Sequence, residues 1–151
     1  MSTKQATCEQ RIAEELAGRL DDLRKLWALQ CAGSDESDPD LGTLNEYGLA
    51  FDYVVPGTFK DQEEGYFRYQ LSWGGPSDEF RFYTSWPEQR CYRIEYTFLD
   101  WFDGATRRLH GEDKDFMQSL FSDFVDVGSA EHVFNEAMKN YEPAYQEDEE
   151  E

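Results

Sequence analysis

The chain has 151 residues, the size of one ordinary domain, and its 33 acidic side chains exceed its 14 lysines and arginines, giving a net charge of −19. This charge argues against direct binding to nucleic-acid phosphates, which requires clustered basic side chains. Aromatic residues make up 16% of the chain, enough to build a core and to argue against disorder over most of its length. No apolar run approaches the ~20 residues of a bilayer-crossing helix and no secretory signal is evident, so we expect a cytoplasmic protein.

The first predicted element is an amphipathic helix over residues 8–31. Its apolar residues recur every three or four positions, which places them on one face of a helix. They are Ile12, Leu16, Leu20, Leu23, Trp27 and Cys31. The acidic, Gly- and Pro-containing stretch 33–46 then predicts a solvated linker inside a single domain that covers residues 1–145.

From Tyr47 to Phe102 the apolar period falls to two, which predicts strands between clusters of turn residues. Four strands are expected, at residues 49–55, 66–73, 79–84 and 91–99. Their short connections favour sequential antiparallel pairing, and therefore a four-stranded meander sheet. Strict alternation along the fourth strand places one set of side chains on a common face, namely Tyr92, Ile94, Tyr96 and Phe98.

The opposite sheet face interleaves aromatic residues with arginines, a composition found on stacking platforms for single-stranded nucleic acid. The net charge opposes that function. We expect cross-strand cation–π contacts and salt bridges there instead. The residues are Tyr66, Arg68, Arg81, Tyr83 and Arg93.

The helical period returns after Asp103-Gly104. One helix begins near Glu112 and ends before Gly128, and a second covers residues 130–141. One N-terminal helix, four strands and two C-terminal helices define an α+β fold, with the C-terminal helices packed on one face of the sheet. Residues 146–151 are expected to form a disordered acidic tail.

The sequence predicts no metal and no cofactor. The three cysteines lack zinc or redox spacing and are expected to be reduced, packed thiols: Cys8, Cys31 and Cys91. His110 precedes Glu112, Asp113 and Asp115, and His132 lies in the last helix, but this spacing matches neither a zinc site nor a calcium loop. The three carboxylates suit a helix start, where they oppose the positive end of the helix dipole.

Carboxylates near aromatic residues leave an enzymatic alternative open. Paired carboxylates can divide the acid and base roles of glycoside hydrolysis. A small enzyme would use a carboxylate and aromatic pocket near Asp52, Glu95, Asp100 and Trp101. Asp103-Gly104 is equally what a turn after a strand requires.

Most of the negative charge lies late in the chain. Residues 102–151 carry 14 acidic against 4 basic side chains, so over half of the net charge is in the last third. Acidic residues off the apolar stripe of the helix near Glu112 form a ridge whose turns, about 5.4 Å apart, loosely match phosphates about 6–7 Å apart. Such a ridge can enter a basic groove that normally holds nucleic acid. The predicted partner-binding residues are Glu112, Asp115, Asp123 and Asp126, with Asp100 and Asp103 as further candidates.

Two phrases also resemble known sequences: GYFRYQLSWGGPSDEFRFY at residues 65–83, and IEY followed by DWFDGA at residues 94–105. They resemble a family of small acidic proteins carried on bacterial plasmids and other mobile elements, over roughly residues 44–110. The resemblance implies a mobile-element setting, in which small acidic proteins inhibit host restriction or CRISPR defences. It implies no catalytic residues.

The sequence therefore predicts an acidic, non-enzymatic binding protein that engages a basic nucleic-acid-binding host protein, with no direct binding to nucleic acid or membrane. Inhibition of restriction or CRISPR defence is the expected role. The alternatives are the small enzyme and a homo-oligomeric assembly module with Trp86 and Tyr92 in a homodimer patch.

Overall fold

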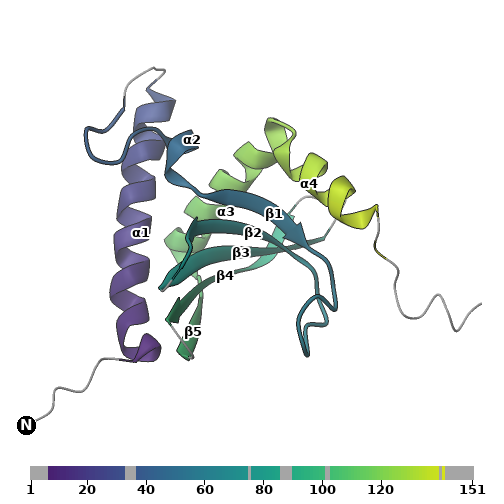
Figure 1. Ribbon diagram of the computed structural model, residues 1–151. Coiled ribbons are helices and arrows are strands. Elements are labelled where there is room, and N and C mark those ends of the chain that lie inside the picture. Colours follow the sequence, from purple (N-terminus) through teal and green to yellow (C-terminus); the bar gives the residue numbers. More distant parts are fainter. Residues whose placement is uncertain are drawn as a thin grey trace, which may run out of the picture.

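The computed structural model describes residues 7–32, 37–74, 76–85, 90–100, 103–139 and 141. These residues form an α+β fold in which helices pack on a five-stranded antiparallel sheet (Figure 1). The helices are α1 (Cys8–Cys31), α2 (Leu44–Tyr47), α3 (Gly111–Asp126) and α4 (Ser129–Met138). The strands are β1 (Ala50–Val54), β2 (Tyr66–Ser72), β3 (Ser77–Ser85), β4 (Arg90–Asp100) and β5 (Asp103–Arg108), and they pair in chain order.

The fifth strand was not predicted. β5 pairs with β4 from Asp100 opposite Asp103 to Glu95 opposite Arg108. Among its six residues only Ala105 is buried, so β5 lacks the apolar alternation by which a strand is detected. It forms because β4 offers a free ladder of backbone N–H and C=O groups.

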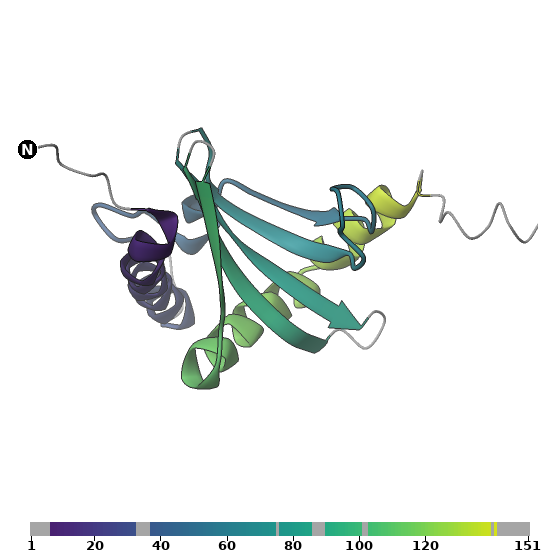
Figure 2. The ribbon, with the colours of Figure 1, turned by 90° about the horizontal axis from the view of Figure 1, so that it is seen from below.

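One face of the sheet holds the aromatic core. In Figure 2, α3 and α4 lie behind the strands, against this face. The ring of Phe121 in α3 lies 5.2 Å from that of Phe67 and 5.1 Å from that of Phe82, between centroids. Phe124 stacks on Phe51 of β1 at 4.0 Å. Phe67, Phe82 and Phe121 are fully buried, and each buried side chain of this size contributes about 1.5–3 kcal/mol, so these rings fix α3 on the sheet.

α1 covers the same face near β4 and β5. Thr7 and Gln10 form a capping box at its start, each side chain bonding the other's backbone N–H. The predicted apolar stripe is largely correct, because Ile12, Leu20 and Leu23 are buried. Cys31, placed on the stripe by its spacing, is exposed at the end of the helix.

The stretch predicted as a linker is partly structured. Asp38 and Gly42 form a β-bridge, and α2 follows it. Leu44 of α2 is buried in the core, so this segment packs against the domain. Residues 33–36 of the stretch and the predicted tail at 146–151 lie outside the described residues.

A bulge in β4 contradicts the predicted alternation there. Tyr83 lies opposite Arg93 and Thr84 opposite Cys91, which leaves Tyr92 without an opposing residue. Tyr92 and Arg93 consequently both bond Glu64, on the face away from the core. Tyr92 therefore does not share a face with Ile94, Tyr96 and Phe98, which stay in the core.

Candidate functional site

Four of the five acidic side chains of α3 lie opposite its core side, whereas Asp113 pairs with Arg24 of α1 at 2.9 Å. At about 100° per residue, positions 112, 115, 123 and 126 fall within about 80° of one another around the helix. Glu112, Asp115 and Asp126 are exposed, and Asp123 is half-buried. We call these four residues the acidic ridge. Within the described ranges none of them forms an ion pair.

The acidic ridge is not evenly spaced. Residues three positions apart in a helix lie about 4.5 Å apart along its axis. This is the axial distance from Glu112 to Asp115 and from Asp123 to Asp126. About 12 Å then separates the two pairs. Ser119 lies in this gap, and its hydroxyl bonds the Asp115 carbonyl oxygen at 3.2 Å. The ridge is thus two pairs of carboxylates, and not the regular phosphate-like array expected from the turn spacing.

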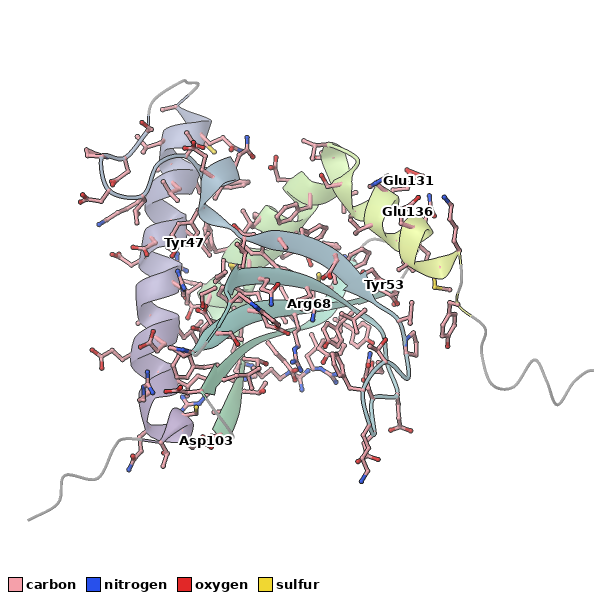
Figure 3. The ribbon with its side chains drawn as sticks, viewed as in Figure 1. Tyr47, Tyr53, Arg68, Asp103, Glu131 and Glu136 are labelled. Atoms are coloured by element: carbon pink, nitrogen blue, oxygen red, sulfur yellow. The ribbon has the colours of Figure 1, made fainter. Side chains whose placement is uncertain are left out.

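Asp100 and Asp103 are engaged within the fold. Arg11 of α1 pairs with Asp100 at 2.5 Å. Asp103 accepts the backbone N–H of Cys8 at 2.7 Å and that of Gly104 at 2.9 Å, and these bonds lower the pKa of its carboxyl group. Figure 3 shows Asp103 beside the first turn of α1.

The two residues also lie far from the ridge. They form the turn end of the β4–β5 pair, whereas α3 begins after the other end of β5, a strand length of about 17 Å away. The structure therefore does not bring the six predicted contact residues together. It separates four unpaired carboxylates on α3 from two that hold α1.

Asp78 is a buried carboxylate that sequence reasoning missed. Arg19 of α1 donates to both of its oxygens, at 2.7 and 3.0 Å. The hydroxyls of Ser72 and Tyr96 each donate to it at 2.5 Å. The cluster fixes α1 on the sheet. The sequence did contain a signal for it. Asp78 lies two positions before Phe80 in β3, and residues two apart along a strand share a face, which places Asp78 on the core face.

Arg19 also connects this cluster to α2. Its Nη1 donates to the hydroxyl oxygen of Tyr47 at 2.9 Å, and that hydroxyl donates to Asp22 at 2.8 Å. Burial, together with the bond to Asp22, raises the pKa of Tyr47 to about 12 against the opposing effect of Arg19. The hydroxyl therefore stays protonated at neutral pH and acts as a structural donor.

The carboxylates of the enzymatic alternative do not converge. Asp52 in β1 and Glu95 in β4 share one cross-strand row but lie three strand spacings apart, about 14 Å. Asp52 pairs with Arg68 at 2.8 Å, and Glu95 with Arg93 at 3.3 Å. Asp100 is held by α1, as described above. Trp101, the aromatic residue of that prediction, and Trp86 of the homodimer patch lie outside the described residues.

The sheet face away from the helices, which we call the open face, carries the predicted ladders. The guanidinium carbon of Arg81 lies 4.9 Å from the ring centre of Tyr66, and that of Arg93 lies 3.9 Å from Tyr83. Arg68 pairs across strands with Asp52 at 2.8 Å, and Arg81 pairs with Glu79 of its own strand at 2.7 Å. The expected cation–π contacts and salt bridges are confirmed, and Figure 2 looks onto this face.

The thiols are of two kinds. Cys8 and Cys91 are buried and Cys31 is exposed. Burial raises the pKa of Cys91 to about 12, so its thiol is protonated at neutral pH.

In the part of the chain that the structure describes, no three His, Cys, Asp or Glu side chains are grouped so as to hold a metal ion. None of the helices in that part is long and apolar enough to cross a bilayer.

Comparisons with protein-family models, curated proteins and solved structures found no significant match to the chain. The plasmid-borne family therefore stays a prediction from the two sequence phrases.

Proposed function

We propose that the protein is a non-enzymatic binding protein whose acidic ridge engages a basic, nucleic-acid-binding protein of a bacterial host, as an inhibitor of restriction or CRISPR defence. One observation carries this proposal. The four ridge carboxylates have no cationic partner within the described residues, whereas Asp78 and Asp100 are each paired with an arginine. Like charges on neighbouring helix positions repel, and a partner that supplies arginines and lysines would relieve that repulsion.

The charge of the whole chain supports the same function. A molecule of net charge −19 attracts a basic partner over distances of about a Debye length, near 10 Å at 0.1 M salt. Such steering mainly raises the association rate and disfavours acidic partners. Glu131 on the outer side of α4, which packs beside α3, enlarges the negative surface (Figure 3).

Capture from a bacterial lysate tests the proposal. The immobilised protein is expected to retain a basic nucleic-acid-binding protein at about 0.05 M salt and to release it at about 0.5 M salt. Duplex DNA added as a competitor is expected to release the retained partner from the immobilised protein, because the acidic ridge and DNA would bind the same groove of that partner.

Two variants with the same change in charge separate the ridge from net charge. The ridge-neutral variant carries Glu112→Gln, Asp115→Asn, Asp123→Asn and Asp126→Asn. The matched control neutralises four exposed carboxylates elsewhere, through Glu14→Gln, Asp40→Asn, Asp61→Asn and Glu63→Gln. Retention is expected to fall about tenfold or more in the first variant and to persist in the second. Equal losses in both variants, or retention that does not respond to salt, would contradict the proposal.

A further inference from the structure

A hollow of about 660 Å³ lies on the open face, across β2, β3 and β4. Phe59, Trp73 and Leu99 form its walls, and Arg68, Arg81 and Glu79 are the charged residues that line it. Its volume falls in the range of about 300–1,000 Å³ typical of small-molecule sites. We call it the open-face pocket.

The walls are unusually exposed apolar side chains. Phe59 is 50% exposed, Trp73 77% and Leu99 38%. They are three of the six large apolar side chains that are exposed in the described ranges, and they surround one pocket. Apolar groups clustered at a hollow indicate a binding surface, whereas scattered exposed ones do not.

The two arginines present free donors to the pocket. They lie directly opposite each other on β2 and β3, an arrangement of like charges that by itself costs stability. Arg68 uses Nε and Nη2 to bond Asp52, and Arg81 uses Nε to bond Glu79. Nη1 of Arg68 and both Nη atoms of Arg81 make no hydrogen bond to any described residue. Figure 3 shows Arg68 on the side of the sheet away from α4.

The charged lining of the pocket differs from that of two other hollows of the described surface. Two arginines and one glutamate line it, and each arginine is paired with one carboxylate, Arg68 with Asp52 and Arg81 with Glu79. The hollow beside α1 is lined by Glu14, Glu15, Asp22 and one arginine, and the hollow between α2 and α3 by Asp123 alone among charged groups. The open-face pocket therefore differs from these two hollows in offering an anion two arginines that keep donors not used in their ion pairs.

We propose that the open-face pocket binds a small planar ligand that carries one anionic group, a carboxylate or a phosphate. The apolar ring lies against Trp73 and Phe59, and the anion accepts hydrogen bonds from the free Nη groups of Arg68 and Arg81. Guanidinium groups suit both anions, because their planar donors match two oxygens at once. This site is on the sheet face opposite the helices and is independent of the acidic ridge.

A fluorescence titration with 8-anilino-1-naphthalenesulfonate tests the proposal, because this probe joins planar rings to one anionic sulfonate. The folded protein is expected to bind one probe per chain. Arg81→Gln and Trp73→Ala are each expected to weaken binding about tenfold, the effect of losing a charged hydrogen bond or a stacking partner. Trp73→Ala removes an exposed side chain and leaves the fold intact, which thermal unfolding would verify.

Matched controls lie outside the pocket. Arg108→Gln removes a cation from β5, and Val127→Ala removes an exposed apolar group after α3, and both are expected to leave binding unchanged. Competition by adenosine monophosphate and by indole-3-carboxylate then identifies phosphate or carboxylate as the preferred anion. Equal binding by the native protein, Arg81→Gln and Trp73→Ala would overturn the proposal. So would equal binding of the uncharged N-phenyl-1-naphthylamine.

Discussion

Aspartates lie both between α1 and the sheet and on the outer side of α3. The first set is bonded within the fold, and the second set has no cationic partner in the described ranges. Asp78 and Asp100 are each paired with an arginine of α1, and Asp103 accepts the N–H of its first residue. The ridge carboxylates of α3 have no such partner in the described ranges. The same side-chain chemistry thus stabilises the fold in one region and is left available for another molecule in the second. Replacing members of each set separates the two roles.

The largest effect is expected at Asp78. Asp78→Asn keeps the shape of the buried side chain but leaves the half-buried Arg19 without its counter-charge, and we expect a loss of about 3 kcal/mol in the free energy of unfolding. Urea unfolding measures it. Pairing this change with Arg19→Met should cost less than the sum of the two single losses. A loss of less than about 1 kcal/mol would show that the cluster does not hold α1.

A smaller, pH-dependent effect is expected at Asp103. Its pKa in the folded protein lies below the unfolded value of about 3.9, so the stability it contributes is present above that value and is lost as the pH falls through the folded pKa. Asp103→Ala should therefore lower the melting temperature most at pH 7, and its effect should shrink progressively as the pH falls below about 3.9. A difference that stays constant across this range would contradict the role of the ionised carboxylate.

Thiol labelling reports on the same end of α1. Cys31 is exposed and should react with an aromatic disulfide reagent at once, while the buried Cys8 and Cys91 should react much more slowly. Burial raises the pKa of Cys8, and Asp103 raises it further. Asp103→Ala should therefore speed labelling of Cys8 severalfold and leave Cys91 unchanged. Equal acceleration at both buried thiols would indicate global loosening of the fold instead.

The smallest effect on stability is expected on α3. The free energy of unfolding of the ridge-neutral variant should lie within about 0.5 kcal/mol of the native value. Relief of the repulsion between the carboxylates offsets the loss of the negative charge of Glu112 at the positive end of the helix. Urea unfolding of the ridge-neutral variant and of Asp78→Asn under the same conditions compares the two losses of stability directly. A loss as large as that of Asp78→Asn would mean that the ridge stabilises the fold.

Local patterns in the sequence predicted much of the fold. Patterns that lie within one element were found close to their ranges: the stripe on α1, the alternation along β2 and β3 and over residues 94–98 of β4, and the apolar faces of α3 and α4. The arginine and aromatic ladders followed from the same alternation.

What was missed depends on residues distant in the chain. Asp78 bonds Arg19 across 59 positions, Asp100 bonds Arg11 across 89 and Asp103 bonds Cys8 across 95. Spacing in the sequence carries no information about such contacts. β5 was missed because a strand with one buried residue has no apolar pattern, and the open-face pocket was missed because it joins a loop residue, Phe59, to three strands.

The most direct test of the central claim is the salt dependence of the affinity for the captured partner. It should be measured for the native protein, the ridge-neutral variant and the matched control. We predict a steep loss of affinity with salt for the native protein and the control, and a much shallower loss for the ridge-neutral variant. Three equal slopes would contradict recognition through the acidic ridge.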